Sequence, residues 1–551
     1  MARGYRRSDR SDGKGDLSRR DLLRLAGAGA GFSFLGLLEA ARPALGAAAS
    51  STLTVGGAGF DIKTLDPGRE LENGANNIDH ATYDSLVTFE GEDLKTPKPS
   101  LATAWTVSQD GKTYTFKLRP NVKFASGNPL TSADFKWSID RVRYLKGNAA
   151  FLLEGLDEVQ TPDPLTVVIR MTEPHPAILP ILSSPVLSAI DSKLVAANGG
   201  DASPDAKTKD QAEAYLNAHS AGTGAFTLDH YIPKQEIVLV KNPNHWRGAP
   251  KIDRVVLRNV AEPSAQELMI KKGDLDVATG IGADQVRSLA GVPGVTVKTS
   301  LASTLVYVMM NQNPQVGGPF AHPKVVEAVR SAIDYKGMLT LAGKGALRQA
   351  GIIPNNFPGA LPAAEAARTD REHAKRLLKE ANLGEISGTL TFAGDLVFYG
   401  IQANLIAQKV QEDLATVGIK INLNGLPYSV AIQQYRDGKN QLGIWQWAAD
   451  YPDVSDYLVF VPGRTVAKRT GWMPEASPVA AQIAQLAKTT ETEIDTAKRV
   501  GLYERLNRMI ASYGPWAPLF QPVTPYAFRS NVRGVTFASA WMVDYYTVSK
   551  T

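Results

Sequence analysis

Two hydrophobic periods alternate along this chain, and segments of the two kinds are interleaved from one end to the other. Alternation with period two is typical of half-buried strands, and it predicts strands over residues 52–56, 164–171 and 251–260. The apolar run TLVYVMMNQN (304–313) is also strand-like. Apolar residues at helical spacing predict helices over 131–142, 262–273, 322–343, 371–381 and 400–417.

Turn signals divide these segments further. AWTVSQDGKTYTFKLRP (104–120) has two β-rich runs around Asp110-Gly111, which predicts a hairpin. The helix after it has Thr131 or Ser132 as its N-cap. GTGAFTLDHYIPKQEIVLVKNPNHW (222–246) predicts two further strands around a turn marked by proline.

The second half of the chain repeats a helix-then-strand order. The helices at 371–381 and 400–417 lead to strands at 389–394 and 419–425, and residues 476–512 are mostly helical. Interleaved helices and strands favour an α/β or mixed α+β fold. With 551 residues, the chain is long enough for more than one lobe, each with a full core.

The N-terminus has the pattern of an export signal. An Arg-rich start precedes a weakly apolar run from Leu22 to Leu38, and small residues end at Ala47–Ala49, which fits a cleavage site. SRRDLLR (18–24) resembles the twin-arginine signal. An ordinary amphipathic helix is the alternative. We therefore expect residues 1–49 to be a signal peptide and the rest to be periplasmic.

Charge and cysteine content exclude several classes. Residues 1–49 contain nine Lys/Arg and five Asp/Glu, so without them the formal charge falls from +5 to +1. A nearly neutral chain gives no argument for a nucleic-acid partner. The absence of cysteine excludes disulfides, a thiol nucleophile and a lipid-modified N-terminal cysteine, so we do not expect a lipoprotein.

Catalytic motifs are absent from the sequence. The seven histidines form no HExxH pair, and there is no phosphate-binding loop and no GxSxG elbow. The carboxylate pairs Asp274/Asp276 and Asp450/Asp453 leave an exported hydrolase as a weaker alternative. We expect no enzyme, no cofactor and no metal.

The stretch IWQWAADYPDVSDYL (444–458) combines two Trp, two Tyr and three Asp. One interpretation is a buried strand that runs into a polar loop. The other is one wall of a pocket for a ligand that is cationic at one end and apolar elsewhere, because an enclosed carboxylate needs a cation and ring faces attract cations.

Five blocks, in one order, together resemble a known family. They are residues 101–142, 222–258, 271–278, 322–339 and the stretch at 444–458. The sequence is similar to the solute-binding proteins of ABC importers in the peptide/nickel/opine class, family 5. The resemblance extends over about residues 52–548.

The resemblance implies a periplasmic-binding-protein type II fold, with two hinged lobes and an extra subdomain. Lobe I would comprise 51–88, 221–310 and 526–551, the extra subdomain 89–220, and lobe II 311–525. The hinge strands would lie near 308–313 and 522–527. Hinges of this kind need only a few residues to absorb the change in backbone angles.

The resemblance also implies a site. In oligopeptide-binding members an Asp in an A-D-Y context holds the ammonium of the ligand, and Ala449-Asp450-Tyr451 match that context. Strand 443–448 would pair with the ligand backbone. The expected ligand-binding residues are Asp450, Trp447, Trp445, Tyr451, Ala448, Tyr83 and Asn311. Alternatively, both Trp are core residues and Asp450 caps a turn.

The implied function is capture of a peptide or peptide-like solute for an inner-membrane permease and its ATPase, by a monomer. Arg436, Arg464 and Arg469 are equal candidates for a ligand carboxylate. An opine, a metal chelate or an oligosaccharide is the alternative ligand within the same class.

Overall fold

The computed structural model describes residues 51–57, 60, 62–69, 71, 73–91, 93–538 and 542–551. The export signal predicted over residues 1–49 lies outside this part of the chain. Residues Ser50–Thr551 form one compact unit. Within the described residues, no helix is both long enough and apolar enough to cross a membrane.

Lobe I is built on a seven-stranded sheet in the order β12-β20-β11-β1-β10-β9-β8. Its strands are β1 (Thr52–Gly57), β8 (Phe226–Ile232), β9 (Glu236–Lys241), β10 (Arg254–Asn259), β11 (Val277–Ala278), β12 (Val295–Leu301) and β20 (Val523–Arg529). Its helices include α1 (Asn73–Thr82), α7 (Pro263–Lys272) and α8 (Ala283–Leu289). The strands predicted at 52–56 and 251–260 are confirmed.

Lobe II is built on a five-stranded sheet in the order β17-β14-β18-β13-β19. The strands are β13 (Thr304–Met310), β14 (Ile386–Ala393), β17 (Ile419–Leu426), β18 (Leu442–Ala448) and β19 (Trp516–Phe520). Both faces of this sheet are covered. Val306, Val308 and Met310 enter one core, while Leu305 and Tyr307 enter the other. This two-sided burial explains why β13 is one continuous apolar run.

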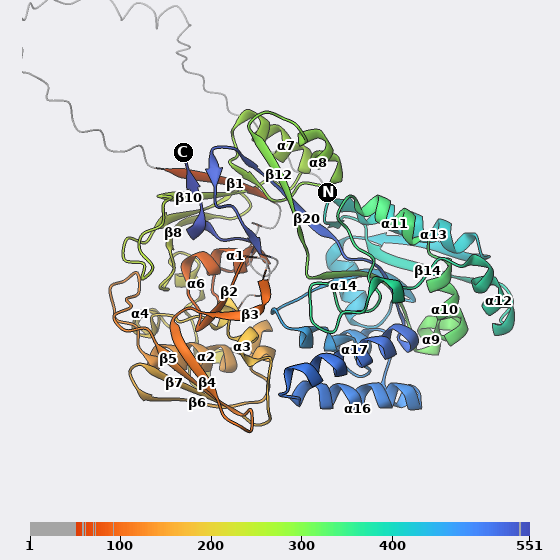
Figure 1. Cartoon of the computed structure of the whole chain (residues 1–551), viewed down its shortest axis with the longest axis horizontal. Helices are drawn as coiled ribbons and strands as arrows, with labels where there is room; N and C mark the ends of the chain where they lie inside the picture. The colour runs from red at the N-terminus through yellow and green to blue at the C-terminus, as the bar shows by residue number, and fades with distance from the viewer. Residues whose placement is uncertain are drawn as a thin grey trace, which may run out of the picture. The chain divides into compact units, whose positions relative to one another are not determined.

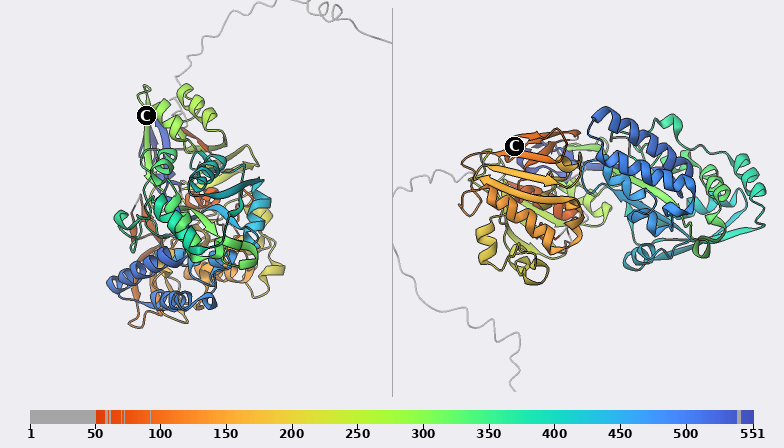
Figure 2. Two further views of the ribbon diagram at one scale, coloured as in Figure 1. Left: turned by 90° about the vertical axis from the view of Figure 1, so that its right-hand side faces the viewer. Right: turned by 90° about the horizontal axis from the view of Figure 1, so that it is seen from below.

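Helices cover the two faces of the lobe II sheet. They are α10 (Pro323–Ala332), α11 (Tyr335–Ala342), α12 (Arg371–Ala381), α13 (Ala403–Ala415), α14 (Tyr428–Arg436), α15 (Thr465–Arg469), α16 (Pro478–Thr492) and α17 (Thr496–Tyr513). The last two lie side by side (Figure 1, Figure 2). The single helix expected over 322–343 is wrong: it breaks at Ile333–Asp334, because the Asp334 carboxylate accepts the N–H of Gly337 and starts α11.

The extra subdomain has its own four-stranded sheet, β4-β5-β7-β6, and its own core. The strands are β4 (Ala102–Val107), β5 (Thr113–Leu118), β6 (Leu156–Asp163) and β7 (Thr166–Met171), and α2 (Ser132–Leu145) packs against them. The hairpin predicted around Asp110-Gly111 is confirmed, and Gly111 has φ of 68°. Thr131 is the N-cap of α2, one of the two residues expected.

A fully buried ion-pair network joins the subdomain to lobe I. Arg141 of α2 donates to both oxygens of Asp66, at 2.7 and 2.6 Å, and to both oxygens of Asp210, at 2.9 and 2.8 Å. None of the three side chains is exposed. Two carboxylates therefore meet one guanidinium, and Arg69 supplies the second cation.

Two motifs of the block at 222–258, GTG (222–224) and NPNHW (242–246), converge on Asp84, just after α1. Thr223 of the GTG motif donates its hydroxyl to Asp84 at 2.7 Å, and Trp246 of NPNHW donates Nε1 at 3.0 Å. A Cβ on Gly224 would lie 2.4 Å from the carbonyl carbon of Thr82. The motif therefore needs glycine because two backbones touch there.

The lobes are joined by two neighbouring crossings. β12 leads into β13 through Ala302–Ser303, and β19 leads into β20 through Gln521–Pro522. β12 and β20 pair over their whole lengths and lie side by side (Figure 1). The first crossing is six residues before the range 308–313 that we expected, because β13 belongs to the lobe II sheet. For the same reason, residues 304–310, which we expected in lobe I, belong to lobe II.

A buried polar network fixes the crossing. The Gln521 side chain donates to the Ala302 carbonyl at 2.8 Å and to Asn356 Oδ1 at 2.9 Å. Asn356 in turn donates to the Ser303 hydroxyl at 2.8 Å. These bonds hold both crossing segments together at the point where the lobes would rotate.

Candidate ligand-binding site

Strand β18 has an open edge where it approaches the crossing. It pairs with β13 over its full length, from Leu442 to Ala448. On its other side only Leu442 and Gly443 pair with β14. Residues 444–448 therefore present backbone groups that no strand of the described chain uses. An extended ligand could add itself at this edge as one more strand.

Asp450 follows this edge, and its carboxylate is unpaired within the described residues. It comes two residues after the end of β18, next to Ala449, whose N–H donates to the Ser303 carbonyl at 3.1 Å. Within the described chain, no hydrogen bond or ion pair reaches its carboxylate. Burial raises its pKa to about 6, although the charge of Arg469 acts in the opposite direction. A buried carboxylate without a partner favours the binding of a cationic ligand.

A second carboxylate, that of Asp456, lies behind Asp450. It is buried, and Trp447 Nε1 donates to it at 2.7 Å. Burial and the nearby Asp450 charge raise the pKa of Asp456 well above its usual range. The two carboxylates thus lie close together. Asp450 is the more exposed of the two and is therefore the one that a ligand could contact. The expectation of an Asp450 turn cap has no such bond to support it.

The neighbours of Asp450 have different degrees of exposure. Trp447 and Ala448 are half-buried. Tyr451 is also half-buried; it contacts the subdomain core, and its hydroxyl lies 3.1 Å from Ser455 Oγ. Trp445 is only 4% exposed and stacks on Tyr435 at 4.4 Å. Trp445 does share a face with Trp447, but its ring belongs to the core.

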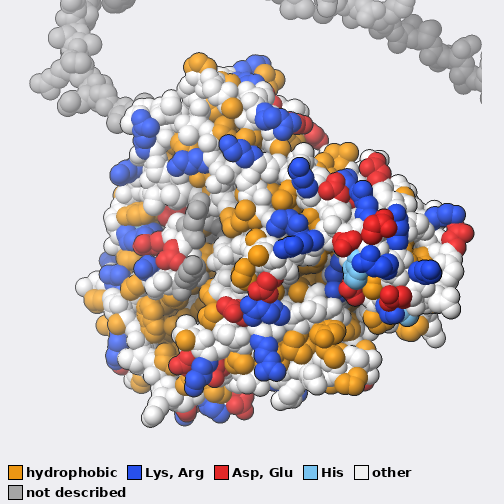
Figure 3. All heavy atoms as spheres, turned by 45° about the vertical axis from the view of Figure 1, so that its right-hand side comes forward, with side chains coloured by type: hydrophobic (Ala, Val, Ile, Leu, Met, Phe, Trp, Pro, Cys, Tyr) orange, Lys and Arg blue, Asp and Glu red, His pale blue; other side chains and the backbone are white. Residues whose placement is uncertain are grey.

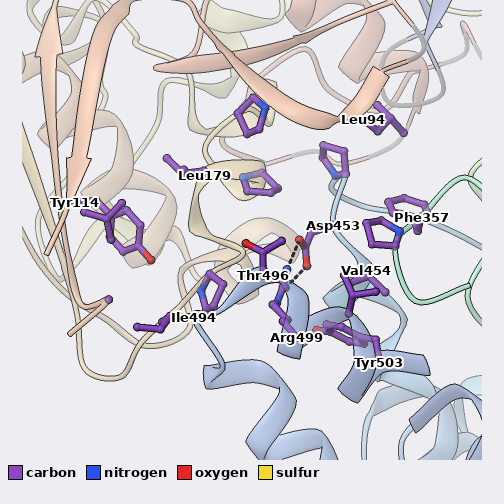
Figure 4. Close-up of a pocket in the computed structure, with 18 of the residues that line it drawn as sticks. Leu94, Tyr114, Leu179, Phe357, Asp453, Val454, Ile494, Thr496, Arg499 and Tyr503 are labelled. Carbon is purple, nitrogen blue, oxygen red and sulfur yellow. Dashed lines mark hydrogen bonds and ion pairs between the residues drawn. The ribbon is translucent and has the colours of Figure 1, made fainter. Parts of the chain in front are cut away.

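A recess lies beside this loop, between the subdomain and lobe II (Figure 4). Its volume is about 510 Å³. We call it the interlobe recess. Its subdomain wall includes Val107, Tyr114 and Leu179, and its lobe II wall includes Phe357 and Val454. Most of the lining is apolar, so the recess suits an apolar group more than a charged one.

One ion pair lies at the centre of the recess. Arg499 donates to Asp453 from Nη1 at 3.0 Å and from Nη2 at 2.6 Å (Figure 4). Asp453 also accepts the N–H of Ser455 at 2.8 Å. Burial alone would raise the pKa of Asp453, but the charge of Arg499 outweighs this effect and holds the pKa below its usual value. Both charges are therefore satisfied within the protein.

The family follows from a comparison with known families. The model of the bacterial extracellular solute-binding proteins, family 5 Middle, matches residues 96–466. That match covers more than half of the chain. The chain belongs to the family 5 solute-binding proteins. This is a family of binding proteins and not of enzymes.

Similar proteins cover this solute-binding protein almost completely. Di/tripeptide-binding protein 2 of Pseudomonas aeruginosa (strain UCBPP-PA14) is 25% identical over 504 residues, which are 86% of this chain and 90% of that protein. The structure of a dipeptide-binding protein from Pseudoalteromonas sp. SM9913 in complex with Met-Leu has a TM-score of 0.77 at 20% identity, and covers 91% of this chain and 100% of its own.

A third comparison is a binding protein from Agrobacterium tumefaciens R10 in complex with mannopinic acid. It has a TM-score of 0.76 at 23% identity, and covers 91% of this chain and 100% of its own. These structural likenesses establish the two-lobe periplasmic-binding-protein fold. The fold class expected from the sequence is thereby confirmed.

Two of the expected site residues lie inside the solute-binding protein's scaffold. Tyr83 is 3% exposed, accepts the N–H of Ala221 and lines a separate cavity of about 190 Å³ between lobe I and the extra subdomain. Asn311 is 1% exposed and donates to the carbonyls of Gly438 and Asn440 at the far end of β13. Neither lines the interlobe recess, because both are buried by their own lobe. We therefore assign both to the scaffold.

Two of the three candidate arginines, Arg464 and Arg469, have contacts that distinguish them. Arg464 is paired with Glu491 at 2.7 Å. Arg469 lies over the ring of Tyr435 at 5.0 Å, and its charge reaches Asp450. Sequence reasoning missed Arg499, which lies in the first turn of α17, 46 residues after its partner Asp453. Its only sequence signal is its place among the polar residues of an amphipathic helix.

The charged side chains on the surface of the solute-binding protein are mixed in sign. On the face shown in Figure 3, basic and acidic side chains are interspersed over lobe II. Across the residues that the structure describes, no three His, Asp or Glu side chains gather where they could hold a metal ion. The loop at 448–456 therefore remains the best candidate for ligand binding.

Proposed function

We propose that this protein is the periplasmic substrate-binding component of an ABC importer and captures a short peptide or a peptide-like solute between its lobes. The protein itself catalyses nothing. It passes the solute to a membrane permease, whose ATPase supplies the free energy. Export by the twin-arginine route and a monomeric state complete the proposal.

The observation that carries the proposal is the position of Asp450. Its carboxylate has no partner in the described chain, and it follows directly on the open edge of β18. An extended peptide on residues 444–448 would bring its α-ammonium to this carboxylate. The ammonium would then supply the charge that burial makes costly to leave unmatched.

The remaining groups suit the rest of such a ligand. Half-buried Trp447 would provide an apolar wall. Arg469 is the arginine whose charge reaches Asp450, so we place a ligand carboxylate on its side. Ala448 and Tyr451 would contribute backbone and ring contacts next to the ammonium.

Mass spectrometry of the solute that co-purifies with native protein, followed by a thermal-shift screen, tests the proposal. Bound ligand stabilises the folded state by mass action. We expect short peptides with a free α-amine to raise the melting temperature and to remain unchanged during the assay. Stabilisation by opines, metal chelates or oligosaccharides alone would replace the peptide. Turnover of the added compound would indicate a hydrolase.

A further inference from the structure

The cavity of about 190 Å³ between lobe I and the extra subdomain has a polar lining of its own. Lobe I contributes the end of α1, the NPNHW motif and the C-terminal segment, and the subdomain contributes Glu90, Pro99 and Arg119 among others. None of the described residues that line it comes from lobe II or from the loop at 448–456. We call it the junction cavity. It is a place separate from the proposed solute site.

Two arginines that line the junction cavity have no carboxylate partner among the described residues. The Arg119 guanidinium carbon lies 4.4 Å from the centre of the Trp246 ring. That of Arg247 lies 5.4 Å from the same ring and 4.2 Å from the Tyr546 ring. Arg119 donates Nη2 to the Ser100 carbonyl at 3.4 Å, while its Nε is buried without an acceptor. The rings hold both guanidinium groups in place and leave N–H groups available.

His245 adds an unpartnered nitrogen to the same cavity. Its side chain is 1% exposed, and Nδ1 lies 3.3 Å from the Gly248 carbonyl oxygen. Nε2 has no hydrogen-bond partner among the described residues. Asp84 Oδ2 is 3.8 Å away from it, which is too long for a hydrogen bond. A buried nitrogen in this state costs free energy, which a bound group could recover.

The carboxylates of the junction cavity are already engaged or lie in solvent. Asp84 accepts two side-chain donors, at 2.7 and 3.0 Å. Asp544 accepts the backbone N–H of Tyr546 at 3.1 Å and caps a helical turn there. Glu90 is exposed, so that water and salt screen its charge. The hydrogen-bonding capacity that the protein leaves unused in this cavity is therefore mainly that of the two guanidinium groups and His245.

This set of groups matches one ligand chemistry. Planar guanidinium groups form paired hydrogen bonds with the oxygens of carboxylates and phosphates. A histidine nitrogen can add a further donor. The cavity is smaller than the roughly 300–1,000 Å³ of pockets for drug-sized ligands, so it suits a small ion.

We propose that the junction cavity is a second binding site of this protein, for a small oxyanion such as inorganic phosphate or the carboxylate of a small organic acid. Arg119 and Arg247 would donate to its oxygens, and His245 would complete the site. The oxyanion would join segments that are distant in sequence and would stabilise the attachment of the subdomain to lobe I. The site shares no residue with the loop at 448–456, so it does not depend on the proposed function.

A thermal-shift titration of the whole protein in Tris chloride tests this site. Phosphate, sulfate and acetate would be added in turn, with sodium chloride at the same ionic strength as the reference. A ligand that binds the folded state raises the melting temperature in a saturable way. We expect at least one of the three oxyanions to do so beyond chloride. A response to phosphate or sulfate without acetate would identify an inorganic oxyanion, and a response to acetate alone would identify a carboxylate. No shift beyond that of chloride would overturn the site.

Calorimetric titration with the most stabilising oxyanion then tests the arginines. Arg247→Gln should weaken binding about tenfold or more, because it removes charge-assisted hydrogen bonds. Arg247 is exposed, so we expect this variant to fold normally. The matched control is Arg258→Gln, another exposed arginine of lobe I that does not line the cavity, and it should keep the wild-type affinity.

A second pair of variants tests the subdomain side. Arg119→Gln should weaken binding to a similar extent. Its matched control is Arg143→Gln, because Arg143 also lies over an aromatic ring and donates to a backbone carbonyl but is outside the cavity. Wild-type affinity in either cavity variant would overturn the site. Equal losses in the matched controls would overturn it as well, since they would reveal a general effect of charge.

Discussion

Asp450 and Asp453 lie three residues apart on one loop, yet the protein treats them in opposite ways. Asp453 accepts two hydrogen bonds from the Arg499 guanidinium and one from the backbone N–H of Ser455. Asp450 has no such bond within the described chain. Accordingly, the pKa of Asp453 is lowered, whereas burial raises the pKa of Asp450 to about 6.

This difference separates structure from function on a single loop. A buried carboxylate that carries its own cation stabilises the fold, or at least does not oppose it. A half-buried carboxylate without a cation costs free energy, which a ligand's ammonium can recover. Charge alone does not distinguish the two carboxylates; the absence of a partner among the described residues does, and it is the reason that we propose Asp450 as the binding residue.

The largest effect should come from breaking the internal pair. Arg499→Met leaves the Asp453 charge buried and unmatched, so we expect the free energy of unfolding to fall by about 3–5 kcal/mol. Urea denaturation measures this change. Arg508→Met is the control, because its pair with Glu365 is largely exposed and should be worth at most about 1 kcal/mol. Equal losses would show that the Asp453 pair is not special.

Removal of the unpaired charge should affect binding instead of folding. For Asp450→Asn we expect the affinity for a free-amine ligand to fall about 10- to 150-fold, because a charge-assisted hydrogen bond contributes about 1.5–3 kcal/mol. Its free energy of unfolding at neutral pH should not decrease. Asp284→Asn, an exposed carboxylate on lobe I, should change neither quantity.

The raised pKa of Asp450 predicts a pH effect on affinity. The ammonium needs the ionised carboxylate, which is about one-tenth populated at pH 5 if the pKa is about 6. Affinity should therefore fall about tenfold between pH 7.5 and pH 5, and Asp450→Asn should flatten the profile. An identical slope in both proteins would assign the titration to another group.

The folding stability of the ligand-free protein should change with pH in the opposite direction to the affinity, because the same carboxylate titrates. The folded state holds the Asp450 proton more tightly than the unfolded state, so this group's contribution to stability falls as the pH rises from about 4 to 6. Ligand-free wild-type protein and Asp450→Asn, compared by thermal denaturation across this range, should converge at low pH.

The smallest effect should come from removing the hydrogen bond between Trp447 and Asp456, the carboxylate next to Asp450. Trp447→Phe keeps the apolar wall but removes the donor to Asp456 at 2.7 Å. We expect a loss of about 1 kcal/mol in the free energy of unfolding. Ligand affinity should change by only a few-fold if the ring itself forms the wall. A large loss of affinity would mean that the Trp447–Asp456 bond positions Asp450.

Much of the fold follows from local pattern. The β4–β5 hairpin, α2 with its cap and the helix-then-strand order of lobe II are all visible in the spacing of apolar residues. The lobe crossing was misplaced because β12 and β13 have similar strand patterns on both sides of Ala302–Ser303. Only pairing with other strands decides which sheet each strand joins.

The candidate site was visible only in part for the same reason. The local context of Asp450 and Trp447 could be seen on one short stretch. The pairing of Asp453 with Arg499, and the burial of Trp445 under Tyr435, depend on residues that are distant in sequence. Spacing cannot tell which carboxylate already has a cation, so that distinction had to come from the structure.

The central claim is that Asp450 binds the α-ammonium of the solute, and one thermodynamic cycle tests it directly. Calorimetry would compare a stabilising peptide with its N-acetylated form, on wild-type protein and on Asp450→Asn. We predict that acetylation weakens binding to the wild type about 10- to 150-fold and has little effect on the variant. An equal penalty for acetylation in both proteins would contradict the account.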